Sequence, residues 1–343
     1  MKKILYYVTD GGKGHATRSI AIIRELLNQN FEVVVRNSNS LELLKRSLPT
    51  SSIISGKTDV GITLQSNGIF IDEEKSKTQI GKWISELDNY VKMECEKISS
   101  LKANLVISDI SIMPLLVANK LNVNSIAVSN FSWYDVLKFL PSDQLSKIKL
   151  AYDFADLAIQ LPIGTDMEHF KNKKNLGLAA RFPTKTREDL RKHFGVKDDE
   201  FVVTFALGGE NPEINCTFGK NIKVFSMDTK VSNSINFTDC TQWTEGQEIV
   251  LASDLVLCKA GYGFLSECIT NGIKFRYVFD ENHMEQASMS DDLKKLGING
   301  SITLEEINNS HFDTDFIRSQ QEIKKQKNNV PSIAKLMLEF LKN

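Results

Sequence analysis

Short apolar runs alternate with segments of helical periodicity along the first half of the chain. Residues 4–9 form an apolar run that ends at a glycine cluster, and residues 16–27 follow with apolar positions at helical spacing. Strands that alternate with helices predict a parallel sheet covered by helices on both faces. The same alternation predicts strands at residues 31–35, 104–108, 125–128 and 157–161, and helices at residues 77–101 and 113–121.

A second series of the same kind begins after residues 162–186, an irregular segment rich in lysine, glycine and proline. Such a segment is typical of a domain boundary. We therefore predict two α/β domains, residues 1–162 and 163–330, facing a central cleft, and a C-terminal helix in residues 331–343 that could pack back on the first domain. The expected strands are residues 201–207, 222–225, 234–237, 255–258 and 275–279, and the expected helices are residues 187–193, 263–270, 284–296 and 331–341.

Composition narrows the class of protein. Of 343 residues, 41% are hydrophobic and 25% charged, which is the mixture of a globular protein and not of a disordered chain. The 42 basic residues are balanced by 43 acidic ones, so nothing in the net charge favours nucleic acid as a partner. Five cysteines without a C-x-x-C pair indicate reduced thiols and no zinc site. The first apolar run is too short for a signal peptide, and no stretch could span a membrane. We expect a cytoplasmic protein, with peripheral membrane contact left open.

A glycine-rich loop, Asp-Gly-Gly-Lys-Gly-His-Ala-Thr-Arg at residues 10–18, joins the first strand to the first helix. Its spacing fits neither a Walker A loop nor a dinucleotide fingerprint. Glycines there allow backbone amides to approach an anion, so Gly11, Gly12 and Gly14 are candidates for a phosphate or acceptor loop. His15 at the loop exit is a candidate general base near neutral pH. The alternative is a histidine that only bonds to backbone.

A second loop of this kind, residues 258–267, also leaves a strand and opens a helix. Gly261 and Gly263 would let amides approach phosphates, and Glu267 lies about one turn into the helix, where it could accept hydrogen bonds from a ribose. The alternative is a tight turn with a glutamate on the helix surface. Two such loops at equivalent strand-to-helix junctions favour the functional interpretation.

These two loops and the two-domain plan resemble the GT-B class of nucleotide-sugar glycosyltransferases, which have two Rossmann-like domains. More narrowly, the chain resembles the family of the bacterial enzyme that adds N-acetylglucosamine to a lipid-linked cell-wall precursor. The resemblance implies that Glu267, in a glycine, Ser266 and glutamate helix start, holds the donor ribose. It also implies that Glu285 and Gln286 contact the donor sugar and that Gly208 and Gly209 approach the diphosphate. Lys259 stands where related loops often carry a histidine, and uridine is only the default nucleobase of the family.

The Gly-His-x-x-Arg pattern within the first loop carries a second resemblance. It is similar to a loop of the UDP-sugar hydrolases of nonulosonic acid biosynthesis, where the histidine is expected to activate water. In some relatives an aspartate orients this histidine. Asp109 follows the strand at residues 104–108 and is the candidate here, with capping of the next helix as the alternative. Asn130 lies in an aromatic segment, residues 129–134, that could line an acceptor pocket or pack in the core.

The sequence thus predicts a glycosyltransferase of the hexosyltransferase type. It would move a sugar from a nucleoside diphosphate sugar, UDP-sugar by default, to a hydroxyl acceptor with inversion, His15 being the base. A lipid-linked acceptor is one option. The alternatives are a nucleotide-sugar hydrolase of the same fold and a protein that binds nucleotide sugars without catalysis. Because the sequence shows no cluster of metal ligands, we expect no metal. We also expect no cofactor, and the balanced charge leads us to expect no nucleic-acid partner.

Overall fold

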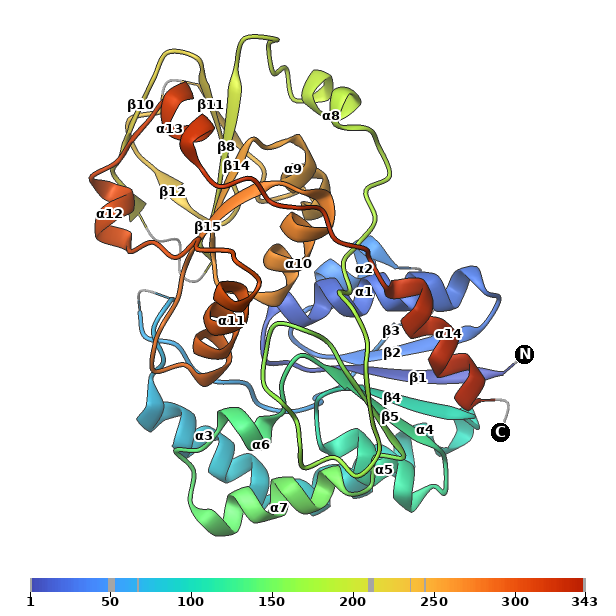
Figure 1. Ribbon diagram of the computed structural model, residues 1–343. Helices are drawn as coiled ribbons and strands as arrows, with labels where there is room; N and C mark the ends of the chain where they lie inside the picture. The colour runs from blue at the N-terminus through green and yellow to red at the C-terminus, as the bar shows by residue number, and fades with distance from the viewer. Residues whose placement is uncertain are drawn as a thin grey trace. The chain divides into compact units, whose positions relative to one another are not determined.

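The computed structural model describes residues 2–48, 53–66, 68–208, 213–234, 236–243 and 245–341, and it contains two α/β units (Figure 1). Unit 1 comprises Met1–Thr63, Asp72–Ala180 and Asn328–Asn343. Unit 2 comprises Leu64–Ile71 and Arg181–Lys327. Residues 163–180, expected at the start of the second domain, therefore belong to unit 1, and a short segment of the first half belongs to unit 2.

Unit 1 contains a seven-stranded parallel sheet with the order β3-β2-β1-β4-β5-β6-β7. The order reverses between β1 (Lys3–Val8) and β4 (Leu105–Asp109), which pair with each other through Val8 and Asp109. In such sheets ligands bind at the carboxyl ends of the strands beside this reversal. The remaining strands are β2 (Glu32–Asn37), β3 (Ile53–Ser55), β5 (Ser125–Ser129), β6 (Leu157–Gln160) and β7 (Lys173–Asn175).

The helix expected at residues 77–101 is interrupted, because α3 ends at Ser85 and α4 begins at Leu87. The C-terminal helix α14 (Val330–Phe340) lies beside α1 in unit 1 (Figure 1). Lys2 Nζ also donates to the carbonyl of Leu341, at 2.6 Å. The other helices of unit 1 are α1 (Lys13–Asn28), α2 (Leu41–Ser47), α3 (Glu73–Ser85), α4 (Leu87–Ile98), a 3-10 turn (Ser99–Leu101), α5 (Met113–Lys120), α6 (Trp133–Val136) and α7 (Ser142–Tyr152).

Unit 2 contains a five-stranded parallel sheet with the order β13-β11-β8-β14-β15. Adjacent residues of β8 point to opposite faces, so Val202 and Val203 belong to different buried hydrophobic clusters. Its strands are β8 (Phe201–Ala206), β11 (Ile222–Ser226), β13 (Phe237–Asp239), β14 (Leu255–Lys259) and β15 (Lys274–Val278). Its helices are α8 (Arg187–His193), α9 (Gly246–Ala252), α10 (Tyr262–Asn271), α11 (Met284–Lys295), α12 (Leu304–Asn308) and α13 (Thr314–Ser319). Two short parallel pairs join β9 (Glu213–Ile214) to β12 (Lys230–Val231) and β10 (Thr217–Phe218) to β16 (His311–Phe312).

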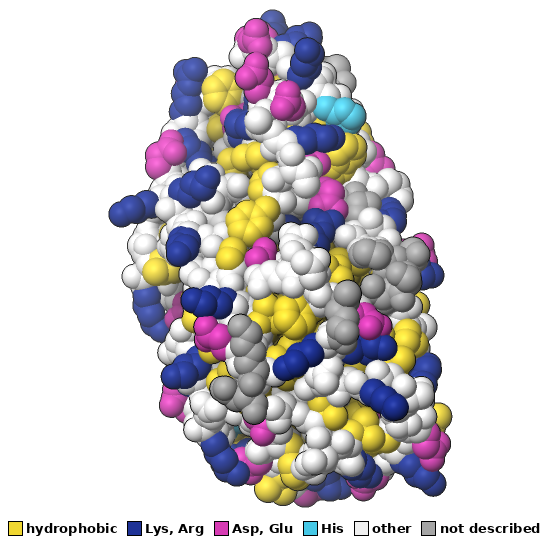
Figure 2. Space-filling view, turned by 90° about the vertical axis from the view of Figure 1, so that its right-hand side faces the viewer, with side chains coloured by type: hydrophobic (Ala, Val, Ile, Leu, Met, Phe, Trp, Pro, Cys, Tyr) yellow, Lys and Arg dark blue, Asp and Glu magenta, His cyan; other side chains and the backbone are white. Residues whose placement is uncertain are grey.

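Charged side chains of both signs are interspersed on the face of the molecule drawn in Figure 2, with hydrophobic side chains scattered between them. Neither sign dominates this face, as the balanced charge of the sequence leads one to expect. Within the described part of the chain, no helix has both the length and the apolar composition needed to cross a membrane.

A buried ion pair joins β2 to α4 in unit 1. Arg36 donates to both carboxylate oxygens of Glu94, from Nε at 2.7 Å and from Nη2 at 2.5 Å. Its Nη1 donates to the carbonyls of Ile54 and Ser55, at 2.8 and 2.7 Å, and the hydroxyl of Tyr7 donates to Glu94 at 3.0 Å. Every charge in this cluster therefore has a partner, and the cluster fixes the edge of the sheet beside β3.

Removing the charge of Glu94 should destabilise unit 1, because Arg36 would remain buried without its counterion. We expect Glu94→Gln to lower the free energy of unfolding by about 3–5 kcal/mol. Glu96→Gln, at an exposed position of the same helix, should change it by less than about 0.5 kcal/mol. Urea denaturation followed by tryptophan fluorescence measures both, and equal stabilities of the two variants would contradict the role assigned to the pair.

Candidate functional site

The backbone at the start of α1 brings His15 to the carboxyl edge of the unit 1 sheet. Gly12, which precedes the helix, has a φ of +146°, a conformation that residues with a side chain rarely adopt. A Cβ at Gly11 would lie 3.1 Å from the ring of Trp133, so this glycine permits a close approach. No side chain caps the first turn of α1. His15 lies in that turn and is buried, with 8% of its surface exposed.

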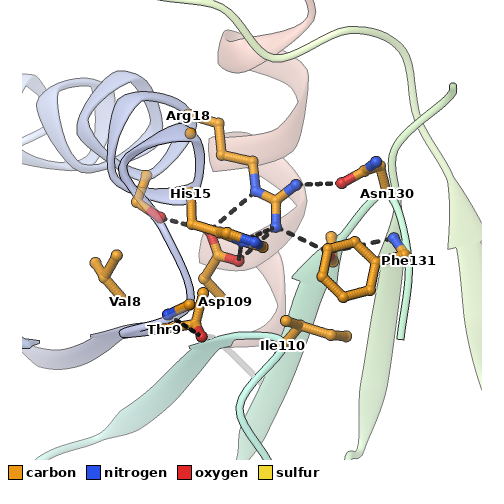
Figure 3. Close-up of polar contacts among 12 residues, drawn as sticks. Val8, Thr9, His15, Arg18, Asp109, Ile110, Asn130 and Phe131 are labelled. Atoms are coloured by element: carbon orange, nitrogen blue, oxygen red, sulfur yellow. Dashed lines mark hydrogen bonds and ion pairs between the residues drawn. The ribbon is translucent and has the colours of Figure 1, made fainter. Parts of the chain in front are cut away.

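Asp109, the last residue of β4, accepts hydrogen bonds from three side chains of α1 (Figure 3). Its Oδ1 lies 2.9 Å from His15 Nδ1 and 2.5 Å from Arg18 Nη2. Its Oδ2 accepts from Arg18 Nε at 2.9 Å and from the hydroxyl of Ser19 at 2.7 Å. Burial alone would raise the pKa of Asp109, but Arg18 and His15 outweigh burial and hold this pKa well below its ordinary value.

The two hydrogens of Arg18 Nη2 identify the tautomer of His15. One hydrogen is directed to Asp109 Oδ1, and the other to the hydroxyl of Ser129 at 2.8 Å. Neither is left for His15 Nδ1, although Nη2 lies 2.6 Å from that nitrogen. Nδ1 therefore carries a proton and donates it to Asp109. In the neutral ring of this tautomer Nε2 has the lone pair, which is the state that a general base requires.

Arg18 was not among the residues predicted for the site, although the Gly-His-x-x-Arg pattern contains it. Its signal is the spacing of three residues from His15, which places both side chains on one face of α1. Arg18 Nη1 donates to Asn130 Oδ1, and Asn130 Nδ2 donates to the carbonyl of Ile163 at 3.0 Å. In this structure the amide of Asn130, predicted for the acceptor or phosphate loop, thus braces Arg18.

The backbone after Asp109 is strained. Ile110 has a φ of +59°, which is unfavourable for a β-branched residue. The hydroxyl of Tyr152 donates to the carbonyl of Ile110 at 2.8 Å. The hydroxyl of Ser108 donates to the carbonyl of Ser111 at 2.6 Å. Strain of this kind persists where the surrounding contacts fix the backbone, and it often occurs at functional sites.

A second buried carboxylate, Asp59, supports the glycine loop and an aromatic wall beside His15. It accepts from the hydroxyl of Thr9, from the amide of Asp10 at 2.8 Å and from the indole nitrogen of Trp133 at 3.1 Å. Burial raises the pKa of Asp59 to about 6, despite the hydrogen bond from Thr9 that lowers it. No local pattern pointed to Asp59, because residues 41–70 lack a clear periodicity.

The aromatic wall consists of Phe131 and Trp133. The ring of His15 lies 5.3 Å from that of Phe131, edge to face, and 6.5 Å from that of Trp133. Both aromatic residues are at least 95% buried. In this structure Phe131 and Trp133 thus pack beside the histidine itself.

In unit 2, the second glycine loop connects β14 to α10. Gly261 is the N-cap residue of α10, Gly263 is buried in its first turn, and no side chain caps the helix. Gly208, after β8, has a φ of +64°, a left-handed conformation that favours glycine. Gly209 lies outside the described residues. Lys259 ends β14, and burial lowers its pKa to about 8, although Glu285 and Asp280 act in the opposite direction.

Glu267 has a partner that the sequence analysis missed. Arg181 Nε donates to Glu267 Oε1 at 2.8 Å, and both side chains are almost fully buried. Burial raises the pKa of Glu267, and Arg181 opposes this. Ser266, also predicted to contact the donor, donates its hydroxyl to the carbonyl of Gly263 at 3.0 Å. Neither side chain is open to solvent in this structure.

The polar cluster after β15 is organised by Asp280, which the sequence analysis did not single out. Its amide donates to Gln286 Oε1 at 3.0 Å, and its carboxylate accepts from the amide of Asn282 at 3.0 Å. Glu285 is half-buried in the first turn of α11. His283 is buried, which lowers its pKa, and its Nδ1 has no hydrogen-bond partner among the described residues.

Two properties of the described residues bear on the expected chemistry. No group of three or more histidine, cysteine, aspartate or glutamate side chains in them could hold a metal ion. All five cysteines are free thiols, and four of them are buried.

Comparison with known families gives a match in the first half of the chain. Residues 2–161 match the model of glycosyl transferase family 1. The chain is also 26% identical over 298 residues to an L-arabinokinase of Arabidopsis thaliana, and the match covers 80% of this chain. It spans only 28% of the length of that relative.

Solved structures resemble the whole chain. The glycosyltransferase SnogD from Streptomyces nogalater is 10% identical with a TM-score of 0.60, covering 100% of this chain and 95% of its own. MurG from Acinetobacter baumannii is 14% identical with a TM-score of 0.56, covering 99% and 100%. UGT89C1 from Arabidopsis thaliana, complexed with UDP, is 12% identical with a TM-score of 0.56, covering 98% and 94%. The predicted fold is confirmed: this is a GT-B glycosyltransferase fold, and residues 2–161 carry the sequence signature of glycosyl transferase family 1.

Proposed function

We propose that the protein transfers a sugar from a nucleoside diphosphate sugar to a hydroxyl acceptor, with His15 as the general base. The observation that carries this proposal is the hydrogen bond from His15 Nδ1 to Asp109, which leaves Nε2 able to accept a proton. The fixed carboxylate also stabilises the imidazolium that forms when the proton is taken. The match to glycosyl transferase family 1 supports the reaction class.

In the proposed reaction, His15 Nε2 accepts the proton of the acceptor hydroxyl as its oxygen attacks the anomeric carbon. The bond between that carbon and the diphosphate oxygen breaks, and the electron pair leaves with the diphosphate. Attack from the side opposite the leaving group inverts the anomeric configuration. Lys259 and the backbone amides at the start of α10 would stabilise the charge that grows on the diphosphate.

Glu267 remains our candidate for the donor ribose. A carboxylate offers about four acceptor positions, and Arg181 occupies only part of them. The pair would then act together, with Arg181 holding the carboxylate in place. UGT89C1, a structural neighbour, was solved with UDP, which supports UDP as the first nucleotide to test. The name of the Arabidopsis relative adds L-arabinose to the sugars worth testing in the donor.

Hydrolysis is the second candidate. His15 and Arg18 belong to the Gly-His-x-x-Arg pattern that resembles a loop of UDP-sugar hydrolases, and both side chains bind Asp109. The same Nε2 lone pair would deprotonate water as readily as an acceptor hydroxyl. Sugar release from UDP-sugars without an acceptor identifies this reaction. A protein that binds donors without catalysis would show neither release nor transfer.

Removing the imidazole should abolish the base without disturbing unit 2. We expect His15→Ala to lower kcat about 10²–10⁴-fold, the usual contribution of a general base, while the Kd for UDP stays within about threefold. The exposed His311 offers a matched control, since His311→Ala should leave both values unchanged. Steady-state kinetics and calorimetry measure the two quantities, and undiminished turnover in His15→Ala would refute the assignment.

Binding of UDP should weaken as the pH rises through 8, because Lys259 is charged below its pKa of about 8 and neutral above it. The loss should be about fivefold between pH 8 and pH 9. Burial lowers the pKa of the neighbouring His283, so its titration lies on the acid side of this range. Lys259→Arg keeps its charge and should remove this loss. An identical pH profile in the variant would show that another group is responsible.

Trp133 should report the titration of Asp59, since the indole donates directly to that carboxylate. Below pH 6 Asp59 is a neutral acid, and above pH 6 it is a carboxylate that binds the indole more strongly. We expect a change in tryptophan emission centred near pH 6 in the native protein. Asp59→Asn cannot titrate, so persistence of the change in this variant would contradict the assignment.

A further inference from the structure

A short hairpin from the first half of the sequence, Leu64–Ile71, belongs to unit 2. Leu64 and Ile71 form an antiparallel bridge, and the amide of Gln65 donates to the carbonyl of Phe70 at 2.8 Å. Gly68 turns the chain with a φ of +68°. The residues on either side of the hairpin pair with each other, since the amide of Asp72 donates to the carbonyl of Thr63 at 2.9 Å.

Three contacts fix the hairpin in unit 2. Ile69 is fully buried in the hydrophobic cluster that contains Val203. Lys259 Nζ donates to the carbonyl of Gly68 at 3.0 Å. The amide of Ile71 donates to Asp280 Oδ2 at 2.8 Å. One hydrophobic anchor and two polar contacts thus hold a segment that is distant in sequence from every other part of unit 2.

The two polar contacts engage Lys259, at the start of the second glycine loop, and Asp280, at the start of the α11 cluster. Lys259 is the cation proposed to bind the diphosphate, and Asp280 positions Gln286 and the turn into α11. His283 and Glu285 lie within electrostatic range of Lys259. His283 Nδ1 is buried without a partner in the described residues, so this polar cluster still has an unused hydrogen-bonding group.

We propose that the Leu64–Ile71 hairpin is an internal competitor of the donor, whose backbone occupies Lys259 and Asp280 until a diphosphate sugar displaces it. The proposal rests on the proposed function, because it assigns the same pocket to the donor. A phosphate forms charge-assisted hydrogen bonds with an ammonium group, whereas the Gly68 carbonyl is a neutral acceptor. Exchange of partners therefore favours the donor, and Asp280 becomes available to a sugar hydroxyl when the amide of Ile71 leaves.

Removing the hairpin should increase donor affinity. Because Leu64 and Ile71 are already bridged, residues 65–70 can be replaced by Asn-Gly, which forms a two-residue hairpin turn. Isothermal titration of the full chain with UDP should then give a Kd about tenfold lower than that of the native protein, since the occupied state no longer competes. Ile69→Ser, which weakens only the anchor, should shift Kd in the same direction. Ser66→Ala, at an exposed hairpin position, is the matched control and should leave Kd within about twofold.

Combining the hairpin replacement with Lys259→Met tests the contact itself, because without the ammonium the replacement should no longer improve UDP binding. Far-UV circular dichroism and the Tm establish that each variant is folded. Equal or weaker UDP binding after hairpin replacement would overturn the competition and leave the proposed function standing. If neither the native protein nor the replacement variant bound UDP or pyrophosphate, both the competition and the proposed function would be overturned.

Discussion

The site in unit 1 depends on one buried carboxylate. Asp109 has no exposed surface, and it keeps its charge because Arg18, Ser19 and His15 all donate to it. A buried charge without such partners would be protonated or would destabilise the fold. The same hydrogen bonds orient the imidazole, select its tautomer and brace the loop that carries Phe131 and Trp133. The contacts of Asp109 therefore serve both the local structure of unit 1 and the chemistry proposed for His15.

The buried charged groups of the unit 2 site also need partners. Two charged groups predicted to contact the donor already have a partner from the chain itself: Glu267 has Arg181, and Lys259 has the carbonyl of Gly68. Leaving these groups buried and unpaired would cost more than any single hydrogen bond contributes. In the function we propose, donor binding at this site is an exchange of partners, and its affinity depends on the strength of the internal contacts that it replaces.

Much of this arrangement is predictable from sequence, because buried parallel strands and glycine-rich strand-to-helix loops leave local patterns. His15 and Asp109 were both identified, and the register of β1 with β4 brings the elements that carry them together. Long-range partners leave no local pattern. Asp59 lies in a segment without periodicity, Arg181 at the junction of the two units, and the contact between Gly68 and Lys259 joins residues 191 positions apart. These contacts arise only from the three-dimensional fold.

The most direct test of the central claim is the protonation state of the His15 ring. Two-dimensional ¹⁵N–¹H spectra of histidine side chains at neutral pH, with His15→Gln used to assign the signal, distinguish the two ring nitrogens. The hydrogen bonds at Asp109 place a proton on Nδ1, and the proposed role of His15 as the base requires a free lone pair on Nε2. A proton found on Nε2 would leave the ring without a basic nitrogen for the acceptor and would contradict the account.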